Sequence, residues 1–155
     1  MSNDISPEME SSRMDSATID DVLEREGTGT LALTDGDSTY GVPLSFGYDG
    51  DDRLYFNFFK QGAESRKVAL ADATDEACFT VYTADSTHDW QSVMVFGEIR
   101  PADSDQLDAL REAIGDNAWY PDLFMPAAPE MGVDQTISQP YVLEIDRVTG
   151  IKSED

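Results

Sequence analysis

The hydrophobic residues of this chain fall in short runs that often alternate with polar or small residues, the pattern of β-strands with one buried face. Turn-forming residues, mainly Asp, Gly, Ser and Pro, separate the runs. Six strands are predicted in this way, over residues 28–34, 40–48, 53–59, 76–82, 90–100 and 141–148. Because turns and only short helices join them, the pattern favours an antiparallel sheet closed into a small barrel.

Three short helices are predicted between the strands. The first has Thr18 as its N-cap, stops at Gly27, and carries an apolar stripe of Ile19, Val22 and Leu23. The second covers about residues 65–73, and the third covers 104–114.

The length of 155 residues is that of one domain with a real core. Residues 1–15 are polar and are expected to form a flexible tail, which leaves residues 16–152 as the single domain. Residues 117–139 contain three prolines and several aromatic residues, and they are predicted to form an irregular arm.

Charge is the strongest global feature. The chain has 32 acidic and 10 basic residues, a net charge of −22, and the acids are spread along the whole sequence. Such repulsion is tolerable where salt screens it, which favours a halophilic, salt-adapted protein. Nucleic acids and anionic membranes are poor partners for it because both need a basic footprint. No apolar run is long enough to span a bilayer and no signal segment opens the chain, so we expect a cytoplasmic protein.

The sequence gives little support for a metal site or for a catalytic nucleophile. His88 is the only histidine, so no multi-histidine metal site exists, and we expect it in a loop. Cys78 is the only cysteine and lies in an apolar run, where a buried small hydrophobic residue is expected. The chain has no P-loop, dinucleotide-binding or nucleophile-elbow motif, and no catalytic residue is assigned.

The strand over residues 40–48 has two unlike faces. Its even positions are all large, and its odd positions are the small residues Gly41, Pro43, Ser45 and Gly47. Because strand side chains alternate, one face packs a core while the other is nearly bare backbone. Such a face can be a platform for a flat ring, or it can be a barrel corner or a tight subunit contact. The pattern alone leaves these alternatives open.

Basic residues gather in one segment, residues 60–67. Three positive charges and one negative give +2 there, and the three are Lys60, Arg66 and Lys67. Ser65 is the expected N-cap of the following helix, whose free N–H groups favour an anion. The segment is therefore predicted to bind a phosphate, the alternative being surface cations paired with nearby carboxylates. Farther on, Gln91 and Ser92 open an apolar strand, and they can recognise a polar heterocycle or simply lie at a sheet edge.

These segments, in this order and spacing, resemble the pyridoxamine phosphate oxidase-like family of FMN-binding split barrels, particularly its nitroimidazole-resistance-like branch. The similarity runs from about residue 20 to 97, with a weaker echo over 141–152. The residues that carry it are Gly29-Thr30-Leu31-Ala32-Leu33, the strand from Tyr40 to Tyr48, Gly62 with Ser65-Arg66-Lys67, and Trp90-Gln91-Ser92-Val93 with Gly97.

The resemblance implies a mainly β fold, a six-stranded antiparallel split barrel with short helices, that binds FMN between the subunits of a homodimer. It puts the phosphate on Arg66 and Lys67, and the flavin ring beside Val42, Pro43, Leu44, Ser45, Gln91 and Ser92. From the aromatic content of the arm we expect Trp119 of the second chain to complete the pocket.

The expected function is an FMN-dependent oxidoreductase that passes electrons from NADH or NADPH to a small acceptor such as a nitroaromatic, a quinone or another flavin. The alternatives are a non-catalytic flavin binder, a redox sensor or FMN carrier, or a split barrel that uses F420 or haem. Oxidation of pyridoxamine phosphate itself is not expected, because the chain lacks a second basic cluster for a substrate phosphate.

Overall fold

The computed structural model describes residues 11–61, 66–115 and 136–154. The helical elements are α1 (Ser16–Arg25), α2 (Arg66–Ala73), the 3-10 turn η2 (Ser104–Gln106) and α3 (Leu107–Gly115). The strands are β1 (Ser11–Arg13), β2 (Thr28–Thr34), β3 (Thr39–Ser45), β4 (Gly47–Tyr48), β5 (Arg53–Gln61), β6 (Ala77–Ser86), β7 (Asp89–Pro101) and β8 (Thr136–Ser153).

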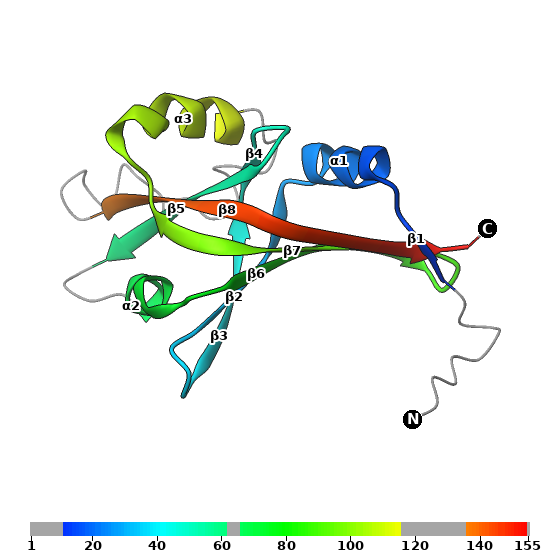
Figure 1. The fold of residues 1–155 in the computed structure, drawn as a ribbon, viewed down its shortest axis with the longest axis horizontal. Helices are drawn as coiled ribbons and strands as arrows, with labels where there is room; N and C mark the ends of the chain where they lie inside the picture. Colours follow the sequence, from blue (N-terminus) through cyan, green and yellow to red (C-terminus); the bar gives the residue numbers. More distant parts are fainter. Residues whose placement is uncertain (1–10, 62–65, 116–135, 155) are drawn as a thin grey trace.

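All pairings in the sheet are antiparallel, in the order β3-β2-β6-β7-β8-β5-β4, with β1 added to β8. Since β3 and β4 follow each other in the chain but lie at opposite ends of this order, the sheet curls into a half-barrel, and the predicted split barrel is confirmed. Figure 1 shows β7 and β8 running side by side through the molecule, with α3 and α1 over their two halves.

The six predicted strands are all present, with three main differences, one of which is that β6 continues to Ser86, four residues beyond its predicted end. The second predicted strand is broken at Phe46, whose backbone N–H donates to the Gly27 carbonyl at 3.2 Å, so it becomes β3 and β4. The last strand is much longer than predicted. This extension offers an edge to β1, because Ser11–Arg13 pairs with Ile151, Lys152 and Ser153.

The N-terminal predictions need two corrections. A flexible tail up to residue 15 is wrong for residues 11–14, because β1 is paired and Met14 is buried; residues 1–10 lie outside the described part. Thr18 is not the N-cap of the first helix. The Asp15 carboxylate accepts a hydrogen bond from the Thr18 backbone N–H at 2.8 Å, so the helix begins at Ser16.

The main core fills the inside of the curl. Phe46 and Phe56 each lie with ring centroids 5.0 Å from Phe79, and all three rings are fully buried. The predicted stripe of α1 joins this core, as do Leu70 and Ala71 of α2. The two helices thereby cover the inside of the barrel.

A second, smaller core lies on the outside of the sheet. Tyr55 of β5 and Val142 of β8 pack there against Leu110 and Ile114 of α3. In β5 the residues on either side of Tyr55 belong to the main core, so α3 covers the opposite face of the sheet. No helix in the described ranges is long and apolar enough to cross a membrane.

Candidate functional site

The part of the outer sheet surface beyond α3 is largely exposed, and we call it the open face. Cross-strand register places Pro43, Thr30, Thr80, Met94 and Thr149 in one row across five strands. A neighbouring row holds Tyr82, Ser92 and Ile151. Most of these side chains are exposed, whereas the residues between them along each strand are mostly buried in the main core.

A groove crosses the open face where two strands part. β2 and β6 pair only over Thr30–Ala32 with Cys78–Thr80, and the rest of each strand diverges from the other. The groove has a volume of about 490 Å³ and is lined by Thr28, Gly29, Thr30, Pro43, Thr80, Tyr82, Thr83 and Ala84. This volume lies in the range of small-molecule sites, roughly 300–1,000 Å³. Its lining is small and rich in hydroxyl groups, apart from Pro43 and Tyr82.

The two faces predicted for the strand over 40–48 exist, but the small face serves two purposes. Pro43 is exposed at the groove, and a Cβ added to Gly41 would meet only a Thr30 methyl carbon at 3.7 Å. At Gly47, in contrast, a Cβ would meet the Ala113 backbone of α3 at 2.6 Å. The platform is therefore available at Gly41 and Pro43, while Gly47 is small to let α3 pack. Val42 and Leu44 face the main core, as the alternation of the strand predicts. Their side chains therefore do not line the groove, and the place beside a flavin ring that the resemblance implies for them stays a prediction.

Ser45 stands out because its hydroxyl is buried without a partner. The residue is 5% exposed, and its Oγ has no hydrogen-bond partner among the described residues. Leaving such a group unpaired costs about 1–3 kcal/mol. Ser45 pairs across the sheet with Thr28, which lines the groove. Ser45 itself is not part of the lining, so a ligand in the groove satisfies this hydroxyl only if its polar edge reaches past Thr28.

Gln91 and Ser92 lie on opposite faces of β7. Ser92 is on the open face, paired between Tyr82 and Ile151. The side-chain oxygen of Gln91 accepts a hydrogen bond from the Arg25 guanidinium of α1 at 2.9 Å, on the other side of the strand. Within one chain the structure therefore does not bring both residues to one ring, because neighbouring strand residues point in opposite directions.

The predicted phosphate site is described only in its backbone. Lys60 lies near the end of β5, and Arg66 and Lys67 open α2. Ser65 and Trp119 lie outside the described residues. The cation-phosphate assignment thus stays a prediction. α2 is held at its far end by Thr74, whose hydroxyl bonds to the backbone of Thr34 and of Leu70.

Cys78 and His88 are both partly or fully exposed. Cys78 is half-buried on the outward side of β6, so the prediction of a buried residue is wrong; burial still raises the pKa of its thiol. The sequence places it in an apolar run, and only the curl of the sheet shows which side is covered. His88 is in the turn between β6 and β7, as predicted for a loop residue. No group of three or more metal-ligating side chains occurs among the described residues.

The groove residues Thr28, Thr30, Thr80 and Tyr82 were not predicted as site residues. Their signal in the sequence is weak: they alternate with apolar residues, as on any solvent-facing strand surface. Their neighbourhood with Pro43 depends on the pairing of β3, β2 and β6, which joins segments about fifty residues apart.

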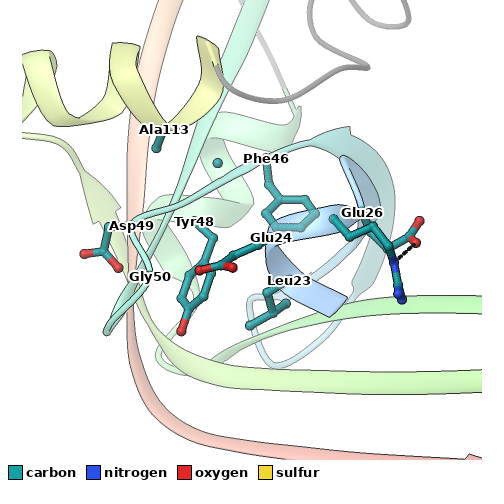
Figure 2. A pocket seen from close by; sticks show the side chains of 10 residues that line it. Leu23, Glu24, Glu26, Phe46, Tyr48, Asp49, Gly50 and Ala113 are labelled. Atoms are coloured by element: carbon teal, nitrogen blue, oxygen red, sulfur yellow. Dashed lines mark hydrogen bonds and ion pairs between the residues drawn. The ribbon is translucent and has the colours of Figure 1, made fainter. Parts of the chain in front are cut away.

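A second cavity, of about 400 Å³, lies between α1, β4 and α3. Figure 2 shows its walls, with the carboxylates of Glu24, Glu26 and Asp49 around it and Ala113 on the side of α3. Tyr48, also in the wall, donates a hydrogen bond to Asp20 at 2.7 Å. Burial, and to a smaller extent this hydrogen bond, raises the pKa of the Tyr48 phenol far above the ordinary 10.0. The three carboxylates outnumber the one cation of the lining, Arg25, which is already paired with Glu26, so this cavity does not suit a phosphorylated ligand.

The comparison with protein families agrees with the fold. The chain belongs to the pyridoxamine 5'-phosphate oxidase family, whose model matches residues 15–152. No protein in the curated set matches the sequence.

Solved structures resemble the whole domain at low identity. An FAD-binding protein from Mesorhizobium loti is 20% identical and has a TM-score of 0.73, covering 94% of this chain and 100% of its own. An FAD-binding protein from Mycobacterium smegmatis is 16% identical, with a TM-score of 0.67 and coverage of 93% and 99%. A proposed 5-nitroimidazole antibiotic resistance protein from Bacteroides thetaiotaomicron is 18% identical, with a TM-score of 0.66 and coverage of 94% and 92%. At these identities the likeness establishes the fold.

Proposed function

We propose that this protein binds a flavin, FMN, in the groove on its open face and acts as an oxidoreductase. The observation that carries the proposal is the groove itself, with small residues on its floor and the buried, unpaired hydroxyl of Ser45 beside it. A flat heterocycle with several polar atoms on its edge suits both features. The FAD-binding relatives by fold support a flavin.

Each predicted residue has a role in this proposal. Pro43 and Ser45 contact the flavin ring, while Val42 and Leu44 pack in the main core and so hold β3 in place. Ser92 reaches the ligand from the open face. Gln91 instead ties β7 to Arg25, and so becomes a positioning residue. The phosphate binds at the start of α2, where Lys60, Ser65, Arg66 and Lys67 add positive charge and hydrogen bonds to the free N–H groups of the helix.

The chain's own contribution is binding, orientation and exclusion of water. A bound flavin supplies electron transfer between NADH or NADPH and a small acceptor such as a nitroaromatic, a quinone or another flavin. Hydroxyl and backbone groups along β2 and β6 tune such a ring through hydrogen bonds to its polar edge.

The open face also supports the proposed homodimer. Three large apolar side chains on it are notably exposed: Tyr82 at 68%, Ile151 at 43% and Met94 at 37%. Exposed apolar side chains gathered on three neighbouring strands, β6, β7 and β8, are typical of a protein contact. A second copy on this face would enclose the groove, and Trp119 of the partner would then reach the ligand. Sedimentation in molar KCl is expected to give a dimer.

Binding is tested with the paired variant Arg66→Ala and Lys67→Ala. The variant is expected to bind FMN more weakly while its affinity for riboflavin stays the same, because riboflavin lacks the phosphate. Titration of both ligands, with FAD as a third, also measures the preference for FMN. Equal losses for FMN and riboflavin would contradict the phosphate site.

A non-catalytic flavin binder, either a redox sensor or an FMN carrier, is favoured by one feature. The described lining of the groove has no carboxylate, imidazole, ammonium or guanidinium group that could move a proton. The two functions differ in one assay. The flavin of an oxidoreductase bleaches when NADH or NADPH is added and recovers with an acceptor, whereas a carrier's flavin stays oxidised and leaves on dilution.

A further inference from the structure

Tyr82 is a large aromatic residue at the wall of the groove. It is 68% exposed, the largest exposed fraction among the described large hydrophobic side chains. Its neighbours in the groove wall are small, Thr80 and Ala84 among them. Among the described residues, no hydrogen bond engages its phenol hydroxyl. Neither a hydrogen bond nor a core contact among the described residues therefore accounts for an aromatic side chain at this position.

The backbone holds Tyr82 at the point where the strands part. The pairing of β2 with β6 ends at Thr80, and Tyr82 is the next residue on the same face. On its other side β6 stays paired with β7, where Tyr82 is opposite Ser92. The Cα of Tyr82 is thus fixed in a sheet while its ring is free to turn.

Across the groove stands Pro43. β2 lies between β3 and β6 in the sheet, so Pro43 and Tyr82 occupy the two sides and Thr28, Gly29 and Thr30 form the floor. Paired strands are about 4.8 Å apart, so β3 and β6 are roughly 10 Å apart where β2 pairs with both, and farther apart at Tyr82, beyond the last pair of β2 and β6. This spacing leaves room for one planar ligand over β2, bounded by a proline and an aromatic ring.

We propose that Tyr82 is the stacking residue of this site, whose phenol ring covers the planar ring of the flavin. The inference rests on the proposed function and deepens it. Aromatic side chains stack on heterocycles at small conformational cost because they have only two side-chain torsions. Stacking also gives Tyr82 a specificity role: it favours flat, aromatic ligands over flexible ones of the same size.

Three variants test the proposal in molar KCl: Tyr82→Leu, Tyr82→Phe and, as a control away from the open face, Arg111→Ala on α3, whose side chain is exposed. Tyr82→Leu is expected to weaken FMN about tenfold, the usual value of one aromatic stack, while Tyr82→Phe keeps most of the affinity. A tyrosine in contact with a flavin quenches its fluorescence by donating an electron, which phenylalanine does poorly. Fluorescence per bound flavin should therefore rise in both Tyr82 variants and stay unchanged in Arg111→Ala.

The outcomes separate the inference from the proposed function. A wild-type protein that binds no FMN refutes both. Normal affinity and fluorescence in Tyr82→Leu, with FMN still bound by the wild type, overturn the stacking role alone. Loss of the dimer in Tyr82→Leu, with unchanged fluorescence per bound flavin, assigns the residue to a subunit contact and overturns it as well.

Discussion

Two buried hydroxyls in this protein should respond in opposite ways when they are removed. Ser45 is 5% exposed and Thr74 is 6% exposed, so their burial is matched. The Ser45 hydroxyl has no partner among the described residues, whereas the Thr74 hydroxyl accepts from the Thr34 N–H at 3.0 Å and bonds to the carbonyls of Thr34 and Leu70. If the Ser45 hydroxyl serves to bind a ligand, it lowers the stability of the ligand-free protein, in which it is buried without a partner.

The magnitudes follow from these partners. An unpaired buried polar group costs about 1–3 kcal/mol, so Ser45→Ala should stabilise the flavin-free protein by about 1 kcal/mol after the loss of a small volume. Thr74→Val keeps the volume but leaves the backbone N–H of Thr34 without its acceptor, so it should lower the free energy of unfolding by about 2 kcal/mol. In a protein of this length 1 kcal/mol shifts the Tm by roughly 2–4 °C.

The assay is urea unfolding of flavin-free protein at constant molar KCl, repeated with saturating FMN. With FMN bound, the advantage of Ser45→Ala should disappear, because the variant loses one hydrogen bond to the ligand and binds it about fivefold more weakly. Thr74→Val should be destabilised equally with and without FMN. A Ser45→Ala protein that is less stable than wild type without flavin, by more than about 1 kcal/mol, would refute the reasoning.

Three further predictions concern the fold. Gly97→Ala should cost about 3 kcal/mol or more in urea unfolding, because a Cβ on Gly97 of β7 would collide with the backbone of β8, beside the bulge where β8 has the extra residue Asp146. Gly115→Ala, with nothing within 4 Å of its added Cβ among the described residues, should be neutral or stabilising. Similar losses in both variants would contradict this argument from close packing. Raising KCl from about 0.1 to 1 M should raise the Tm, because the Debye length falls from about 10 to 3 Å and repulsion within the −22 charge weakens. An equal effect of sucrose, which does not screen charge, would argue against charge as the cause. Tyr48 and Tyr141 each donate a hydrogen bond to an aspartate, and burial, followed by these bonds, raises the pKa of both phenols above 10.0. The unfolded chain therefore loses these phenol protons at lower pH than the folded chain does, so the free energy of unfolding should fall as pH rises through 10. A variant with both tyrosines replaced by Phe should show a flatter dependence of stability on pH.

Local pattern was enough for the elements and for the class of fold. The strand over residues 28–34 agrees with the structure at both ends, since an alternating run closed by Asp and Gly needs no distant contact to be recognised. The unlike faces of β3 are likewise a property of neighbouring residues. The predicted N-cap of α1 lies three residues too late, because Asp15 and Thr18 are both good caps and local pattern does not choose between them.

The candidate site shows which features the local sequence pattern cannot predict. By itself the sequence determined six strands, short helices, an acidic surface, a smooth-sided strand and a basic cluster, because each is set by residues close together in the chain. Only the tertiary structure decided that α3 covers Gly47 but leaves Pro43 open, that Gln91 faces α1 while Ser92 faces outward, and that β2 and β6 part to form a groove beside Tyr82. These outcomes depend on how the sheet curls and which strands become neighbours, and that is settled by contacts between segments far apart in sequence.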